Sequence, residues 1–130
     1  MSVVKSNAYG HGLIDFSRQL VKLGVDWLGV DSIVEAVALR QAGIKTPILV
    51  LGYTQPVNFS VAQKNGVVIT ISSFDSLVTL LKLPRLPQFH LKLDTGMHRQ
   101  GFTLSDFAVA LTLLAKPATA KKVKANLLGA

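Results

Sequence analysis

Residues 3–12 read Val3-Val4-Lys5-Ser6-Asn7-Ala8-Tyr9-Gly10-His11-Gly12. The two valines before Lys5 are typical of the end of a buried strand, and the glycines permit a tight turn before the helical pattern that follows. A lysine at the carboxyl end of a strand, above a strand-to-helix turn, lies where α/β enzymes place their chemistry. Its amine can form a Schiff base with an aldehyde, the first step of pyridoxal-phosphate catalysis. The alternative is a strand-end lysine that extends into water.

Apolar runs rich in β-branched residues recur along the chain at regular intervals. They cover residues 2–5, 27–30, 47–51, 67–71, 89–93 and about 123–128. Helical patterns lie between them, and the first five runs end roughly 20 to 25 residues apart, which is typical of βα units with parallel strands. Two architectures fit this alternation. One is an open doubly wound sheet, and the other is part of a (β/α)8 barrel, which takes about 250 residues when complete.

Helix signals predict where the segments between the strands begin and which faces they bury. Ser32-Ile33-Val34-Glu35 is a capping box that predicts a helix start at Ile33. The predicted buried faces are Leu13, Phe16, Leu20 and Leu23 in the first helix, and Phe107, Leu111 and Leu114 in the last, which Ser105 is expected to cap. Residues 116–124 are predicted to form a loose polar segment.

The composition argues against several classes of protein. The chain has 130 residues, 49% of them hydrophobic, which predicts one globular domain. It has no cysteine and no apolar run near the roughly 20 residues of a membrane span, so we expect a cytoplasmic protein without a membrane partner. The net charge is +7, but no aromatic residues interleave with the one basic cluster, at 121–124, so nucleic acid is not an expected partner. The histidines lack metal-ligand spacing, so no metal is expected.

A second group of polar residues follows the fifth predicted strand. His90-Leu91-Lys92-Leu93 leads into Asp94-Thr95-Gly96-Met97-His98-Arg99-Gln100-Gly101-Phe102. A lysine within a buried strand is costly unless it is paired or modified, which makes Lys92 a candidate site residue. Arg99 can bind a carboxylate or a phosphate with two parallel hydrogen bonds. Each of these residues alone also has a purely structural interpretation.

Together the two segments resemble the signatures of the pyridoxal-phosphate-dependent alanine racemases. Residues 4–12 are similar to the segment that carries the cofactor lysine, and residues 90–97 with Arg99 are similar to the fifth barrel strand and its loop. Stretches within residues 26–52 resemble the family in the same order, whereas from Thr103 onward only the alternation of helix and strand supports it. The resemblance implies an α/β fold: a partial (β/α)8 TIM barrel of the alanine racemase N-terminal domain type, with about five βα units and a sixth strand.

The resemblance also implies which residues bind the cofactor, pyridoxal 5′-phosphate. Lys5 is the implied catalytic residue, which holds the cofactor as an internal aldimine and then acts as one of two acid–base groups at the substrate α-carbon. Tyr9 would bind the cofactor phosphate, and Leu51 would contact the cofactor. Arg99 would lie near the phenolic oxygen of the cofactor and the carboxylate of the substrate.

Other implied roles concern the substrate. Met97 would lie beside it, and Lys92 matches a lysine that is carbamylated in many members and orients the arginine equivalent to Arg99. Three residues depart from the family pattern, and the first is Ser6, which replaces a common alanine. His98 replaces a common glycine, where it could narrow the substrate site, hydrogen-bond Lys92 or face solvent, and Gln100 replaces a frequent leucine.

The largest departure from the family is a missing domain. The second acid–base group of the family is a tyrosine in a C-terminal β-domain, contributed by the partner in a homodimer, and residues 1–130 contain only Tyr9 and Tyr53. We therefore expect an incomplete barrel domain of an enzyme that interconverts L-alanine and D-alanine for peptidoglycan synthesis. Alone, the fragment is expected to be inactive, and either to pair with a second copy or to be unstable. The alternatives are a racemase for serine or other amino acids, a non-catalytic cofactor-binding fragment, and a phosphate-binding doubly wound module.

Overall fold

The computed structural model describes residues 1–129, which contain one six-stranded parallel sheet. The strands are β1 (Ser2–Val3), β2 (Leu28–Val30), β3 (Ile48–Tyr53), β4 (Val68–Ile71), β5 (Phe89–Leu91) and β6 (Leu127–Gly129). Each pairs in parallel with the next in the chain, so the spatial order is the sequence order. A doubly wound sheet would reverse its order at a switch point, so this alternative is wrong. Within residues 1–129 the sheet is an open part of a barrel, since β1 and β6 do not pair with each other.

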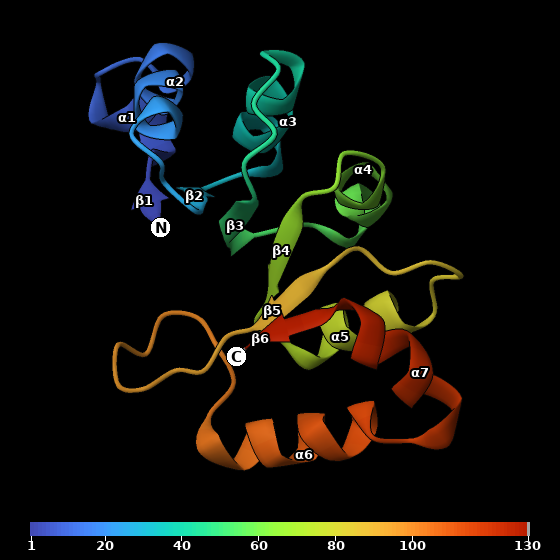
Figure 1. The fold of residues 1–130 in the computed structure, drawn as a ribbon. Helices are drawn as coiled ribbons and strands as arrows, with labels where there is room; N and C mark the ends of the chain where they lie inside the picture. Colours follow the sequence, from blue (N-terminus) through green and yellow to red (C-terminus); the bar gives the residue numbers. More distant parts are fainter. Residues whose placement is uncertain (130) are drawn as a thin grey trace.

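Helical segments follow the strands and cover the outer side of the curved sheet (Figure 1). They are α1 (Lys5–Tyr9), α2 (Leu13–Lys22), α3 (Ile33–Gln41), the 3-10 turn η1 (Pro56–Asn58), α4 (Phe59–Lys64), α5 (Phe74–Leu81), α6 (Leu104–Leu114) and α7 (Pro117–Asn126). None of the helices in the described residues is long and apolar enough to cross a bilayer. The sheet with its outer layer of helices confirms the predicted partial barrel of βα units.

Strand residues alternate between a helix-facing core and an inner face. Val30, Val50 and Ile69 belong to the buried core beneath the helices, together with Phe59 and Leu80 of α4 and α5. The intervening residues of each strand point to the inner face, as the period of two requires. Trp27 lies just before β2 and His90 lies on β5, so β3 and β4 separate them in the sheet. Their ring centroids are nevertheless only 6.1 Å apart, because the sheet curves around its inner face.

The structure confirms one predicted helix signal, the capping box at Ser32, and differs from two other predictions about the helices. The capping box of α3 is present, with Ser32 Oγ accepting from the Glu35 amide at 3.3 Å. The prediction that Ser105 caps α6 is wrong, because Thr103 Oγ1 accepts the Asp106 amide at 3.2 Å. The predicted loose segment 116–124 is also wrong. It forms most of α7, since Pro117 sits at a favourable first helical position and alanine and lysine are good helix formers.

Two predicted buried faces are partly wrong. In α2, Leu23 is 84% exposed because the helix ends at Lys22, and Phe16 is 37% exposed, with its ring stacked on His11. In α6, Leu111 is 44% exposed, and the fully buried Ala110 faces the core instead. A small residue there lets α6 approach the neighbouring elements closely, an option that a hydrophobicity pattern does not reveal.

Candidate active site

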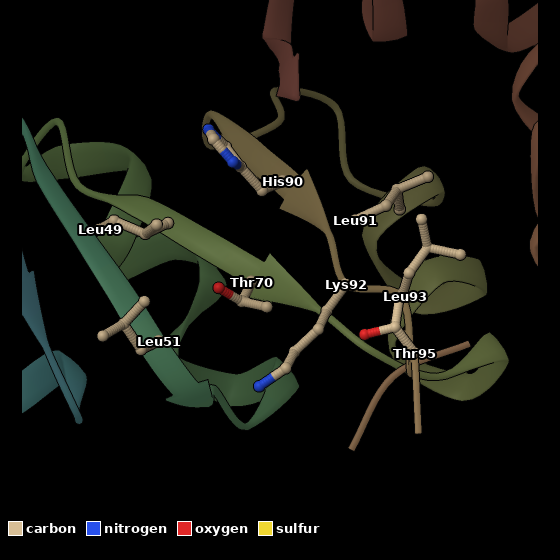
Figure 2. A pocket seen from close by; sticks show the side chains of 8 residues that line it. All are labelled: Leu49, Leu51, Thr70, His90, Leu91, Lys92, Leu93 and Thr95. Atoms are coloured by element: carbon tan, nitrogen blue, oxygen red, sulfur yellow. The ribbon is translucent and has the colours of Figure 1, made fainter. Parts of the chain in front are cut away.

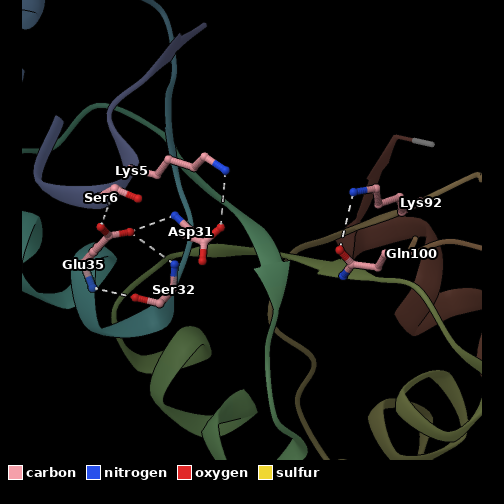
Figure 3. Close-up of polar contacts among 7 residues, drawn as sticks. All are labelled: Lys5, Ser6, Asp31, Ser32, Glu35, Lys92 and Gln100. Atoms are coloured by element: carbon pink, nitrogen blue, oxygen red, sulfur yellow. Dashed lines mark hydrogen bonds and ion pairs between the residues drawn. The ribbon is translucent and has the colours of Figure 1, made fainter. Parts of the chain in front are cut away.

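Lys5 follows the first strand at its carboxyl end. Val4 before it is fully buried, whereas the Lys5 side chain is 35% exposed and points to the inner side of the sheet. Its Nζ lies 3.8 Å from Oδ1 of Asp31, the residue that follows β2 (Figure 3). The carboxyl ends of parallel strands meet at one edge of a barrel, so two residues far apart in sequence come into contact here.

The residues after Lys5 form a left-handed turn rather than an ordinary helix. Residues 6–9 have φ between 52° and 56°, although none of them is glycine. Such a conformation costs an L-residue roughly 1–2 kcal/mol. The sequence predicted a tight turn made by the glycines, but Gly10, with φ of 95°, only ends it. One side-chain bond supports the turn from within, because the Leu13 amide donates to Asn7 Oδ1 at 2.8 Å.

Glu35 links the two loops that carry Lys5 and Asp31. Its Oε1 accepts the Ser6 amide at 2.7 Å, and its Oε2 accepts the Asp31 amide at 2.8 Å and the Ser32 amide at 3.3 Å. Sequence reasoning identified Glu35 as part of a capping box and missed these longer-range bonds. The signal was absent from the sequence because Ser6 lies 29 positions away.

Lys92 approaches from the other side of the same edge, one residue after β5. It is half-buried, and its Nζ donates to Gln100 Oε1 at 3.5 Å, while Gln100 Nε2 donates to Ser72 Oγ at 3.1 Å (Figure 3). Arg99 is exposed beside it. Of the three positions considered for His98, the structure has it facing solvent, with its side chain 87% exposed and Nδ1 3.6 Å from Asp94 Oδ2.

One cavity collects most of the predicted site residues. Its volume is about 410 Å³, within the range of about 300–1,000 Å³ typical of small-molecule sites. It is lined by Lys5, Asp31, Leu51, Gly52, Lys92, Arg99 and Gln100. Four of the six predicted site residues, Lys5, Leu51, Lys92 and Arg99, therefore meet here. The other two, Tyr9 and Met97, do not line this cavity as formed by residues 1–129, and their side chains are 64% and 75% exposed.

A second cavity, of about 380 Å³, lies on the inner face of the sheet and shares Leu51 and Lys92 with the first. Figure 2 shows Leu51 on β3, Thr70 on β4 and Lys92 just after β5 among the side chains that line this cavity. Thr70 is satisfied internally, because its hydroxyl donates to the Val50 carbonyl at 2.6 Å. His90 Nε2 is buried without a hydrogen-bond partner in the described part of the chain, and burial lowers the pKa of His90.

The charges that line the first cavity define the ligand it can hold. Lys5, Lys92 and Arg99 contribute three cationic groups, and Asp31 contributes one carboxylate. Such a set favours an anionic ligand, and a lysine amine at the wall can bond covalently to an aldehyde. Pyridoxal phosphate combines an aldehyde with a phosphate, so the donor set of this cavity fits that cofactor.

Comparison with known proteins gives the family. A family model described as "Alanine racemase, N-terminal domain" matches residues 1–126. The chain belongs to this family. It is 41% identical over 111 residues to an alanine racemase of Methylacidiphilum infernorum, a match that covers 82% of this chain and 29% of that protein. It is also 41% identical over 104 residues to an amino-acid racemase of Enterococcus faecalis, covering 79% of this chain and 15% of the other.

Solved structures of the family share the fold of this racemase domain. An alanine racemase of Clostridium difficile 630 matches with a TM-score of 0.80 at 36% sequence identity, over 88% of this chain and 32% of that one. The chain thus spans about a third or less of the length of these alanine racemases, 29% of the Methylacidiphilum infernorum protein and 32% of the Clostridium difficile one. These matches confirm the expected barrel type and the predicted family.

Proposed function

We propose that the chain is the cofactor-binding part of an alanine racemase, which interconverts L-alanine and D-alanine with pyridoxal 5′-phosphate. The observation that carries this proposal is the shared cavity of Lys5, Lys92 and Arg99, at the carboxyl ends of parallel strands in a chain of this family. Four of its lining residues, Lys5, Leu51, Lys92 and Arg99, are residues that the sequence predicts for the site.

In this proposal four residues would hold the cofactor. Lys5 would bond covalently to the cofactor aldehyde, and Leu51 would lie against the cofactor. Arg99 would lie near its phenolic oxygen, and Tyr9, on the exposed left-handed turn, would bind the phosphate. When bound, the cofactor supplies an electron sink that stabilises the carbanion left after an α-proton is removed.

The chain's own residues then move the proton and orient the substrate. The Lys5 amine would take or return the proton on one face of the α-carbon. Arg99 pairs with the substrate carboxylate, and Met97 lies beside the substrate. The proton on the other face belongs to a second acid–base group, which we assign to a partner subunit of a homodimer.

Lys92 is proposed to orient Arg99, with carbamylation of its amine as the form that does so. A carbamate would convert a half-buried cation into an anion able to pair with the guanidinium of Arg99. Gln100 suits both forms of Lys92. Its carbonyl oxygen accepts from an ammonium at 3.5 Å, and the reversed amide would donate to a carbamate oxygen.

The proposed setting is a cytoplasmic homodimer that provides D-alanine for peptidoglycan. A second candidate function is racemisation of other amino acids, which the resemblance to the Enterococcus faecalis amino-acid racemase favours. A third is cofactor binding without turnover by residues 1–130 alone, since the chain spans so little of its relatives. A racemisation assay comparing the 130-residue chain with a chain extended by a racemase C-terminal domain separates the third candidate from the others.

The test of the proposed site is borohydride trapping with pyridoxal phosphate, followed by peptide mass mapping. We expect a reduced adduct that is dominant at Lys5 over the other lysines and absent from Lys5→Ala. Labelling scattered evenly over surface lysines would contradict the proposal.

A further inference from the structure

The carboxylate of Glu35 has more partners than a helix cap requires. A capping box needs the bond from the amide of Ser32, and that bond is the longest of the three that Glu35 accepts, at 3.3 Å. The two shorter bonds, at 2.7 Å from Ser6 and 2.8 Å from Asp31, lead away from the helix. Glu35 is also the only glutamate in the sequence, so no second glutamate can replace it.

The two shorter bonds hold the backbone beside both members of an ion pair. The amide of Ser6 lies in the peptide plane between Lys5 and Ser6, and the amide of Asp31 lies in the peptide plane between Val30 and Asp31. The side chains of Lys5 and Asp31 form the ion pair itself, with 3.8 Å between Lys5 Nζ and Asp31 Oδ1. Figure 3 shows the resulting ring, in which Glu35 closes one side and the ion pair closes the other.

The turn that starts at Ser6 needs such an external support. Four consecutive non-glycine residues in left-handed conformation are unfavourable and persist only where the surroundings determine them. A hydrogen bond to an ionised carboxylate is about twice as strong as one between neutral groups. The Ser6 amide donates this bond at the first residue of the strained turn. Ser6 directly follows Lys5, so the turn sets the direction of the Lys5 side chain.

We propose that Glu35 is a positioning residue for Lys5: by holding the Ser6 and Asp31 amides it keeps the left-handed turn in place and directs the Lys5 amine into the cavity. The proposal rests on the proposed function of Lys5. Glu35 itself does not line the cavity within residues 1–129, so its effect passes through the backbone of the two loops.

The decisive variant is Glu35→Gln, with Ser32→Ala as its matched control. Glutamine keeps the shape but offers one acceptor oxygen, so it cannot hold the amides of both Ser6 and Asp31. Ser32→Ala removes the hydroxyl that caps α3 and leaves both amide bonds of Glu35 in place. If Glu35 acts only as a cap, the two variants should behave alike.

Two readouts follow from the geometry, and the first needs no cofactor. In amide hydrogen exchange measured by NMR, we expect Glu35→Gln to speed exchange about tenfold at Ser6 or at Asp31, whichever amide loses its acceptor oxygen, whereas Ser32→Ala should leave both unchanged. In borohydride trapping with pyridoxal phosphate, we expect Glu35→Gln to lower the Lys5 adduct severalfold relative to the adducts at other lysines. Ser32→Ala should retain the dominant Lys5 adduct.

The unmodified chain provides a further check if Glu35→Gln does not fold. NMR couplings across the hydrogen bonds should connect the amide nitrogens of Ser6 and Asp31 to the Glu35 carboxyl carbon. Absence of both couplings, or unchanged exchange of both amides in folded Glu35→Gln, would overturn the positioning role. Absence of a Lys5 adduct in the unmodified chain would instead contradict the proposed function, and the exchange and coupling results would still decide the role of Glu35.

Discussion

Gly52 packs directly against the backbone carbonyl of Asp31. The amide of Gly52 donates to the Asp31 carbonyl oxygen at 3.1 Å, and a β-carbon on Gly52 would overlap that oxygen. The register between β3 and β4 shifts at this point, between Val50 and Tyr53. A glycine inside a strand often marks such a close backbone approach. Here it brings the end of β3 against Asp31, the residue that pairs with Lys5.

Gly52→Ala should therefore destabilise the fold and widen the site. We expect a loss of about 1–3 kcal/mol in the free energy of unfolding, because the obstacle is backbone that cannot rotate away. Urea denaturation followed by circular dichroism measures this. Gly29→Ala is the matched control, since its added carbon would meet the flexible Leu51 side chain at 3.1 Å and should cost less. Equal losses in the two variants would contradict the interpretation.

Arg40 should be the most important polar side chain for stability. Its guanidinium donates to four backbone carbonyls, those of Ile44 and Thr46 at 2.8 Å and those of Asn65 and Gly66 at 3.0 Å. It thereby joins the turns that end α3 and α4. We expect Arg40→Ala to cost about 3 kcal/mol, and Arg40→Lys to recover little because an ammonium cannot span both turns.

Arg18→Ala is the comparison for Arg40. Arg18 is exposed and bonds Asp15 at 3.3 Å and the Ala42 carbonyl at 3.4 Å. Its loss should cost less than about 1 kcal/mol in the same unfolding measurement. An equal loss in the free energy of unfolding for both variants would show that the four carbonyl bonds of Arg40 do not stabilise the fold more than the bonds of Arg18 do.

His90 should make stability fall on mild acidification. Burial lowers its pKa below the ordinary value of 6.5, so near and below that pH the unfolded chain binds a proton more readily than the folded one. The contribution of neutral His90 is fully present above pH 6.5 and is lost as the pH falls toward the lowered folded pKa. Unfolding free energies measured from pH 7.5 to 5 should decline in the unmodified chain and less in His90→Leu. The exposed His11, changed to asparagine, should leave the decline unchanged.

Asp94 should also make stability fall as the pH falls, but in a more acidic range than His90. The amides of Gly96 and His98 both donate to Asp94 Oδ1 at 3.0 Å, and these bonds lower the pKa of the Asp94 carboxyl below 3.8. The stabilisation is present above pH 3.8 and is lost as the pH falls through the folded pKa. Asp94→Asn should speed amide exchange at Gly96 and His98 at neutral pH, with Asp75→Asn on α5 as the control.

Parts of the fold could be predicted because they depend on local chemistry. The capping box at Ser32 formed as predicted, since it needs only residues three positions apart. The parallel strands followed from the spacing of apolar runs. The faces of α2 and α6 were predicted less well, because Leu23 and Leu111 satisfy a helical pattern without having a neighbour to cover them.

By itself, the sequence determined the alternation of strands and helices, the family, and the placement of Lys5 and Lys92 after apolar strands. These properties are encoded in residue type and spacing along the chain. Only the tertiary structure decided that Lys5 meets Asp31, that Glu35 holds the amide of Ser6, and that Tyr9 and Met97 do not line the cavity of Lys5 as residues 1–129 form it. Such contacts depend on the curvature of the sheet and on a left-handed turn of non-glycine residues, and both are set by interactions between segments distant in sequence.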